Sequence, residues 1–415
     1  MPSVSSLPFR LLRHRDFALF FYGTFVSMIG MGIHLIGVNW YILQTTGAET
    51  KVSLIMMTSL SAGLFILPFS GSIIDRHARR TMVILPDVVR GTIVLTVGLF
   101  ALSADFPIWV LWPMAFVVGS GHAFYFPASS ALLQEILPPE EYMNANSLRE
   151  ITFQVGSLAA AGVAGWVVAT FGISGVLIFD ATTYFFSAFC VSRIHSGRVP
   201  HPERDTSATY WSTIKSGLRY LMDNRAIFIF GIIAMMPFVT VMALNVLMPT
   251  FVHNTLQRGP VTYGLLDMMY GLGAFTGAAI IGSLVIGKHE KDTLRLFLAS
   301  LAAGYLVFAF TSHIAIAFGI SIVIGFLVAS FRIVSQTYLM KVIPGPLMGR
   351  CTSTFFQISL IVQLSMIFGV GYAAEHVSIG SGFILLTLLL TGALIHFWFL
   401  RHRLPEPAAA EVVDA

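Results

Sequence analysis

Ionisable side chains inside long apolar segments are the residues of this sequence best placed to do chemistry. Asp180 lies near the middle of one such segment, and no basic residue stands one helical turn from it. A carboxylate in apolar surroundings holds a proton more firmly than it does in water, so Asp180 could take up and release one. Asp87 and Asp267 lie in two further apolar segments and are candidates for the same role. A structural role stays open, in which Asp180 accepts hydrogen bonds from hydroxyls such as that of Thr183.

Two histidines and one arginine could complete a proton pathway. Arg90 stands three residues after Asp87, so the two share one helical face and can form an ion pair. His34 and His122 lie within apolar segments, where an imidazole could relay protons near neutral pH. The alternatives are that the Asp87–Arg90 pair only holds helices together and that both histidines are hydrogen-bonded core residues.

Polar and aromatic residues in the same segments could line a path for a solute. Arg332 is the only basic residue deep within the apolar segments of the second half. It could bind an anionic group of a substrate, pair with an acid, or extend toward the inner face. Further candidates for the lining of a substrate cavity are Asn39, Asn245, Gln336, Gln357, Tyr270 and Phe126. Contacts between helices are the alternative role for these side chains.

A membrane scaffold has to position these groups. The chain has 415 residues, of which 56% are hydrophobic and 11% charged, against roughly 25% charged in a soluble domain. Six apolar runs long enough to cross a bilayer fall in each half. They are residues 17–43, 52–74, 81–102, 108–136, 145–170, 173–191, 226–251, 263–286, 294–311, 314–342, 347–374 and 382–400. The expected fold class is therefore an all-α membrane protein with twelve transmembrane helices.

The distribution of basic residues orients the chain. Of its 24 Lys and Arg residues, twenty fall in the termini and in loops on one side, and only Lys51 and Arg258 fall in loops on the other. Basic loops stay on the cytoplasmic side, so we expect both termini in the cytoplasm. These loops account for the net charge of +4, and no nucleic-acid partner is expected. The sequence has no nucleotide-binding loop, Cys/His metal cluster or nucleophile elbow, so we expect neither an enzyme nor a metal site.

Two halves are joined by one long polar stretch. We expect a six-helix bundle at residues 1–194, a cytoplasmic linker at 195–225, a second six-helix bundle at 226–403 and a cytoplasmic tail at 404–415. Apolar positions within 211–222 recur with helical spacing, which predicts an amphipathic helix on the inner leaflet. An ungapped shift of 206 residues pairs Gly119 with Gly325 and Asn39 with Asn245, which indicates an internal duplication.

One stretch between two apolar runs combines a glycine, an acid and several arginines. Its members are Gly71, Asp75, Arg76, Arg79 and Arg80, and we expect residues 71–80 to form a short loop at the inner face. Asp75 could accept hydrogen bonds from arginines or from a nearby helix N-terminus. Contacts that form in one arrangement and break in another would make a gate. The alternative is that the charges only orient the loop.

This stretch resembles the signature loop of the major facilitator superfamily of transporters, Gly-x-x-x-Asp-Arg/Lys-x-Gly-Arg/Lys-Arg/Lys, from which Ala78 departs. Residues 11–17, 123–137, 144–148, 178–183 and 347–350 further resemble the branch that includes enterobactin-type siderophore exporters and macrolide efflux proteins. Gly156, Gly162 and Gly165 resemble the glycine motif of antiporter members, although Ser157 stands where that motif has proline.

The resemblance implies two bundles related by a pseudo-two-fold axis, with the substrate cavity between them, and alternating access driven by the proton gradient. It implies export of a small organic molecule across a bacterial inner membrane, with a siderophore as the first expectation and a macrolide or drug-like compound as the second. No cofactor is expected. We expect a monomer, which could work with an outer-membrane efflux partner. An importer or lipid flippase on the same scaffold, and a non-transporting membrane sensor, stay open.

Overall fold

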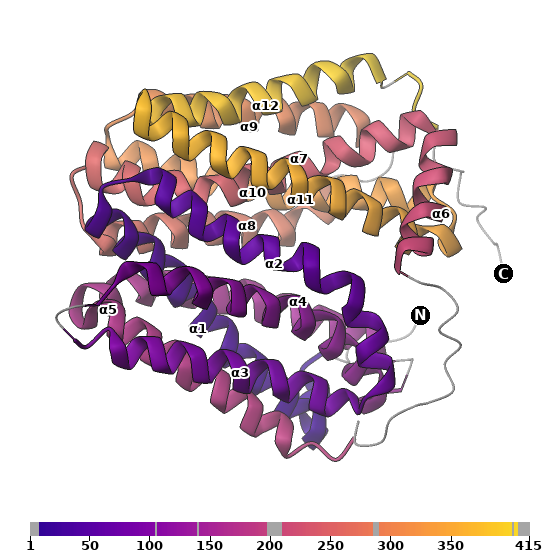
Figure 1. The fold of residues 1–415 in the computed structure, drawn as a ribbon. Helices are drawn as coiled ribbons and strands as arrows, with labels where there is room; N and C mark the ends of the chain where they lie inside the picture. The colour runs from indigo at the N-terminus through magenta and orange to yellow at the C-terminus, as the bar shows by residue number, and fades with distance from the viewer. Residues whose placement is uncertain are drawn as a thin grey trace. The chain divides into compact units, whose positions relative to one another are not determined.

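Helices make up every long element of the part of the chain that the computed structural model describes, which is residues 8–103, 106–138, 141–196, 210–284, 290–400 and 402–405 (Figure 1). Ten of these helices are long and apolar enough to cross a membrane, by length and composition. Together with α2 (Glu49–Arg76), and with α5 (Tyr142–Ser192) counted as two segments, they match the twelve expected spans.

The chain divides into two compact units. The first comprises Met1–Ser207 and Val252–Met268. It begins with a 3₁₀ turn at Pro8–Arg13. Its long helices are α1 (Arg15–Thr46), α2, α3 (Arg79–Phe100), α4 (Leu111–Ile136), which follows a 3₁₀ turn at Ile108–Val110, and α5.

The break in α5 lies at Gly172, which has φ 62° and ψ −164°. Glycine adopts this left-handed φ without the strain that a Cβ would cause. The break falls between the two apolar segments that the sequence separates after Thr170 and before Ile173. The predicted boundary is therefore confirmed.

α1 packs closely on the second half of α5 because glycines recur along one of its faces. Gly23, Gly30 and Gly37 stand seven residues apart, and each meets atoms of α5. A Cβ added at Gly30 would lie 2.8 Å from the Asp180 Oδ1 atom and would collide with the Thr183 hydroxyl. Small residues at a crossing let two helices approach closely, so the next turn of α1 comes within side-chain reach of α5.

The second unit comprises Ala208–Phe251 and Met269–Ala415. Its helices are α6 (Tyr210–Asp223), α7 (Arg225–Thr250), the later part of α8 (Pro260–Leu284), α9 (Glu290–Phe310), α10 (Ile314–Val342), α11 (Gly345–His376) and α12 (Ile379–Leu400). A π-helical turn at Phe251–Thr255 follows α7, and only its first residue belongs to this unit. Phe251, Phe308 and Phe383 form an aromatic core, with ring centroids 5.2–5.6 Å apart.

The amphipathic helix predicted within the linker is α6. It packs on the start of α11, where Gly217 lies against the backbone carbonyl of Arg350. The stretch that precedes it, 197–209, lies outside the described residues. In the structure this helix therefore has a packing role within the second unit.

The two units repeat one close helix crossing. In the first, a Cβ at Gly119 of α4 would collide with the carbonyl oxygen of Ser59 on α2. In the second, a Cβ at Gly325 of α10 would collide with the carbonyl oxygen of Tyr270 on α8. Gly119 and Gly325, which the internal shift aligns, thus permit the same close helix crossing in the two units. This supports the duplication.

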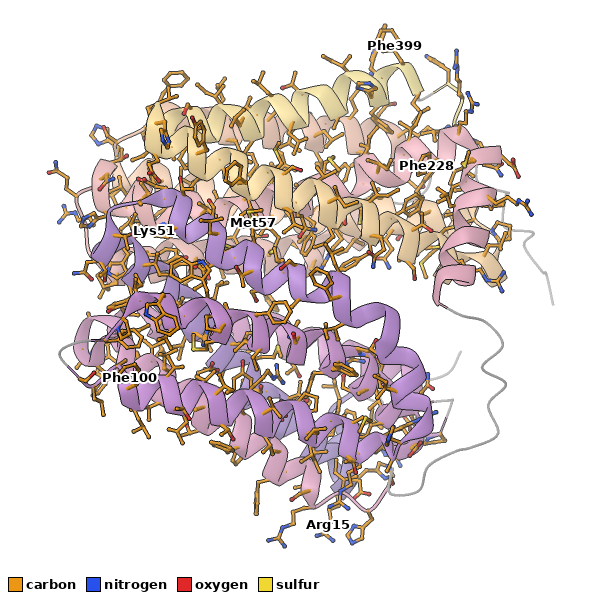
Figure 2. All side chains as sticks on the ribbon, viewed as in Figure 1. Arg15, Lys51, Met57, Phe100, Phe228 and Phe399 are labelled. Atoms are coloured by element: carbon orange, nitrogen blue, oxygen red, sulfur yellow. The ribbon has the colours of Figure 1, made fainter. Side chains whose placement is uncertain are left out.

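Large apolar side chains remain exposed on the helices of each unit. Phe100 of α3 is 46% exposed and Phe399 of α12 is 66% exposed (Figure 2). Such exposure would cause aggregation in water, whereas lipid tails cover it without cost. The surface agrees with the membrane assignment.

One expectation about local structure is wrong. α2 continues through Arg76 and α3 begins at Arg79, so only His77 and Ala78 of the stretch 71–80 are non-helical. The residues after Gly71 include no proline and no second glycine, so nothing local stops the helix. The connection between α2 and α3 is a two-residue turn rather than a ten-residue loop.

Candidate functional site

His34 and Asp180 form an ion pair inside the first unit. The His34 Nδ1 atom lies 2.7 Å from Asp180 Oδ2, and the side chains are 13% and 0% exposed. His34 follows Gly30 by one helical turn, so the close α1–α5 crossing produces this contact. The sequence identified both residues as candidates but not their pairing. The alternative partner, the Thr183 hydroxyl, donates to the Asp180 backbone carbonyl instead, at 2.7 Å.

A second ion pair lies on α3. The guanidinium of Arg90 donates to Asp87 Oδ1, and both residues are buried. The pairing predicted from their spacing is therefore confirmed. The Arg90 guanidinium also lies 4.4 Å from the ring centroid of Tyr184 on α5 and 5.3 Å from that of Tyr125 on α4. Neither aromatic contact was predicted, because both depend on how α3, α4 and α5 pack.

The two ion pairs belong to one group, and we call His34, Asp87, Arg90, Asp180 and Tyr184 the charge cluster. Tyr184 stands one turn after Asp180 and interacts electrostatically with both carboxylates and with Arg90. Asp87 and Asp180 are also close enough to interact with each other. With a neutral His34 the cluster holds two negative charges and one positive charge. One added proton brings its formal charge to zero, which a buried site strongly favours.

His122 lies beside the charge cluster on α4, within electrostatic reach of Arg90. Its side chain is exposed, so it borders the cluster rather than filling it. Asp267 lies elsewhere in the first unit, one turn after Tyr263 at the start of α8. The ring of Tyr263 stacks on that of Trp40, with centroids 6.3 Å apart. The proton roles of His122 and Asp267 stay predictions.

The two arginines that end the signature stretch bind carbonyl groups at the ends of other helices in the first unit. Arg79 donates to the Ala131 carbonyl at 2.9 Å and pairs with Glu135 at 3.0 Å, both near the end of α4. Arg80 donates to the carbonyls of Val191 and Ser192 at the end of α5. Cations at a helix C-terminus interact favourably with the helix dipole. Arg79 and Arg80 thus link the start of α3 to the ends of α4 and α5. Glu135 is a partner that the sequence analysis did not identify.

The remaining members of that stretch are only partly described. Gly71, Asp75 and Arg76 lie within α2, but the side chains of Asp75 and Arg76 and the surroundings of Gly71 lie outside the described residues. The gating role predicted for these three residues stays a prediction.

The predicted cavity residues do not converge on one described site. On α10, Arg332 and Gln336 stand one turn apart, and both side chains are exposed. Tyr270, Asn245 and Gln357 are half-buried in the second unit. The side chain of Phe126 lies outside the described residues.

Asn39 belongs to the first unit and is fully buried. Its amide nitrogen lies 3.8 Å from the sulfur of Met56. Asn245, its partner under the internal shift, donates to the Val241 carbonyl of its own helix at 3.1 Å. The aligned asparagines therefore make different contacts in the two units.

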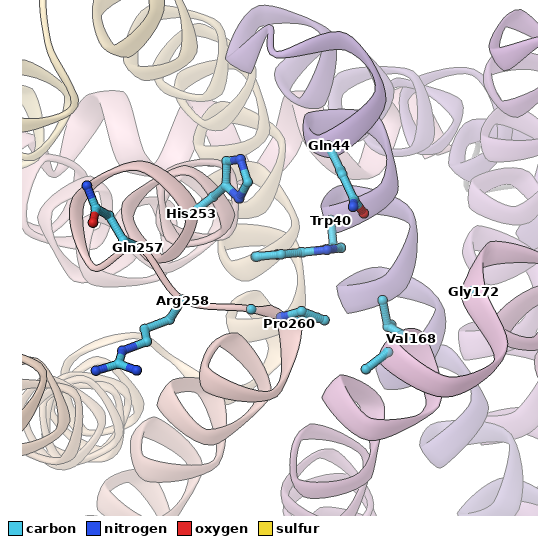
Figure 3. Close-up of a pocket in the computed structure, with 10 residues that line it drawn as sticks. Trp40, Gln44, Val168, Gly172, His253, Gln257, Arg258 and Pro260 are labelled. Carbon is cyan, nitrogen blue, oxygen red and sulfur yellow. The ribbon is translucent and has the colours of Figure 1, made fainter.

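A cavity of about 670 Å³ opens at the Thr46 end of α1, within the first unit. It is lined by Trp40, Gln44, Val168, Ala169, Gly172, His253, Gln257, Arg258, Gly259 and Pro260. Figure 3 shows Gln44 and Pro260 close to the Trp40 ring, whereas the side chains of Gln257 and Arg258 extend away from it. None of the predicted cavity residues lines it. The sequence carries only the Gly-Pro turn signal at 259–260.

Comparison with known proteins places the chain among transporters. The Major Facilitator Superfamily model matches residues 20–370. The MFS-type transporter YkuC of Bacillus subtilis is 23% identical over 365 residues, which cover 82% of this chain and 81% of YkuC. Macrolide efflux protein A of Streptococcus pyogenes is 19% identical over 288 residues, 68% of this chain and 71% of that protein. The multidrug efflux pump Tap of Mycolicibacterium fortuitum is 21% identical over 391 residues, 91% of this chain and 94% of Tap.

Solved structures agree on the fold. The crystal structure of the nucleoside transporter NupG superposes with a TM-score of 0.74 at 12% identity and covers 93% of this chain and 99% of that one. A bacterial homologue of the lysosomal transporter Spinster gives a TM-score of 0.66 at 12% identity, with 93% and 95% coverage. At identities this low, the similarity shows only that the fold is shared. The twelve expected spans, the duplicated crossing and the family match lead to one conclusion: this chain belongs to the Major Facilitator Superfamily.

Proposed function

We propose that the protein is a proton-coupled exporter of small organic molecules, acting by alternating access in a bacterial inner membrane with both termini in the cytoplasm. The observation that carries the proton coupling is the charge cluster. It holds one negative charge more than it can pair internally when His34 is neutral. A proton on the His34–Asp180 pair removes that imbalance, and its release to water restores it.

The direction and substrate class rest on the relatives. Those named for macrolide efflux and multidrug efflux match most of the chain, and BacE of Bacillus amyloliquefaciens, named a putative bacilysin exporter, is 27% identical over 60% of it. We therefore propose a macrolide-like or other drug-like compound as substrate. A siderophore, which was the first expectation from the sequence, is the second candidate substrate and is tested separately.

The test uses inside-out membrane vesicles from cells that produce the full chain. Radiolabelled erythromycin is added outside, and an acid-inside pH gradient is imposed; enterobactin replaces it in the second arm. We expect gradient-dependent accumulation that a protonophore abolishes. Asp180→Asn should lose this accumulation but keep exchange of labelled for unlabelled substrate, because exchange needs no net proton movement.

The matched control is Asp292→Asn on α9. Asp292 is 61% exposed and pairs only loosely with Arg295, at 3.5 Å, so accumulation should stay at the wild-type level. Accumulation by Asp180→Asn equal to wild type would refute the coupling role. Accumulation only under the opposite gradient would replace the exporter with an importer.

A further inference from the structure

Tyr184 lies where the two ion pairs of the charge cluster meet. It is 1% exposed; its hydroxyl interacts with the Arg90 guanidinium but donates no hydrogen bond to the described residues. Asp87 Oδ2 and Asp180 Oδ1 are likewise without a hydrogen-bond partner among them. Unsatisfied buried polar atoms are rare and costly. Three of them within one charge cluster indicate a site built for more than one arrangement of its charges.

The second arrangement follows from the proposed proton coupling, on which this inference rests. When the proton leaves the His34–Asp180 pair for water, Asp180 keeps its negative charge and His34 becomes neutral. Arg90 is then the only positive charge in the charge cluster, and it is paired with Asp87. The Tyr184 ring supports the guanidinium on its face, one helical turn from Asp180. A cation within about 6 Å of a ring centroid is attracted by the ring face, whichever carboxylate it pairs with.

We infer that Tyr184 is the positioning residue of the charge cluster: its ring holds the Arg90 guanidinium where Asp87 and Asp180 can share it once the His34–Asp180 pair has released its proton. The Tyr184 hydroxyl supports the same state, because it can donate to whichever carboxylate oxygen is unpaired. When a proton returns from water to the pair, Arg90 belongs to Asp87 alone. Only N–H and O–H bonds form and break in this cycle.

Groups from four helices act on Tyr184, Arg90 or Asp180 and enter the same electrostatic balance. They are His34 from α1, Asp87 and Arg90 from α3, His122 and Tyr125 from α4, and Asp180 on α5 itself. Tyr125 is the other ring near Arg90, at 5.3 Å, and its hydroxyl lies 3.0 Å from that of Thr24. It already has a polar partner, so it is not equivalent to Tyr184.

Two substitutions separate the ring from the hydroxyl. Tyr184→Leu removes both, and we expect gradient-driven erythromycin accumulation to fall by about 10- to 30-fold while exchange persists. Tyr184→Phe keeps the ring, and accumulation should recover most of the way. The matched control is Tyr305 on α9, a fully buried tyrosine whose hydroxyl donates to Thr240 at 3.0 Å. Tyr305→Leu should lower accumulation and exchange together.

A second measurement is independent of transport. Melting temperatures are compared for purified wild type, Tyr184→Leu, Asp180→Asn and the double variant. If the ring serves to share Arg90 with Asp180, Tyr184→Leu lowers the melting temperature less in the Asp180→Asn background than in wild type. An equal loss in both backgrounds overturns the inference, because a ring that only fills space does not sense Asp180. If wild-type vesicles show no gradient dependence, the proposed function fails and the melting temperatures alone decide this inference.

Discussion

A single methyl group at Gly30 tests the geometry on which the candidate site depends. The Cβ of Gly30→Ala would lie 2.9 Å from the Thr183 Cβ atom and 2.8 Å from Asp180 Oδ1, and it would overlap the Thr183 hydroxyl. Contacts this short cannot persist, so α1 and α5 must separate or Thr183 must rotate. Rotation would break the hydrogen bond from Thr183 to the Asp180 carbonyl. Either way the 2.7 Å contact between His34 and Asp180 is disturbed.

The cost has two parts. Overpacking a close helix crossing costs about 1–3 kcal/mol. Loss of the hydrogen bond to a charged partner adds about 1.5–3 kcal/mol. Native proteins are stable by only about 5–15 kcal/mol, so we expect a clear drop in melting temperature. Gradient-driven efflux should fall at least tenfold, as expected for about 1.4 kcal/mol or more.

The assay compares the melting temperature of the purified protein and vesicle accumulation of erythromycin. Gly319→Ala on α10 is the control, because a Cβ there meets nothing within 4 Å, so its effect should be neutral or slightly stabilising. Gly30→Ala/Thr183→Ala should recover part of the loss, since it removes the hydroxyl that the new methyl overlaps. A Gly30→Ala variant with the melting temperature and efflux of wild type would refute the claim that this crossing positions the site.

Three further changes test the scaffold. Arg79→Glu should lower stability by about 1–3 kcal/mol, because it leaves the half-buried Glu135 facing a like charge. The swap Arg79→Glu/Glu135→Arg should restore much of the lost stability. Equal melting temperatures for the single and double variants would contradict the pairing. Gly325→Ala should reduce the amount of folded protein in the membrane as strongly as any core substitution, measured by size-exclusion chromatography in detergent, and unchanged yield would argue against the duplicated crossing. Tyr338→Phe removes the hydroxyl that donates to the Pro405 carbonyl at 2.6 Å. Loss of this hydrogen bond should cost about 0.5–1.5 kcal/mol and speed proteolysis of the C-terminal tail. An unchanged proteolysis rate would argue against a stabilising role for this hydrogen bond.

Local features of the sequence were enough for the scaffold. Long apolar runs must become helices in lipid, because a helix satisfies every backbone polar group within one segment. The apolar runs also ended one segment at residue 170 and began the next at 173, and the structure places the break between them at Gly172, where glycine takes the observed φ without strain. The pairing of Asp87 with Arg90 also followed from sequence, because three residues along a helix place two side chains on one face.

Packing decided the rest. His34 and Asp180 are 146 residues apart in the chain, and no spacing rule relates them. They meet because Gly30 lets α1 approach α5, a distance fixed by side-chain volume at the crossing and not by helix periodicity. The contacts of Arg79 with Glu135 and of Arg90 with the Tyr184 ring likewise depend on how neighbouring helices pack. The sequence therefore determined which charged residues lie within apolar segments, while the tertiary structure decided which of them pair and which, like His122 and Arg332, are exposed, because that depends on contacts between helices far apart in the chain.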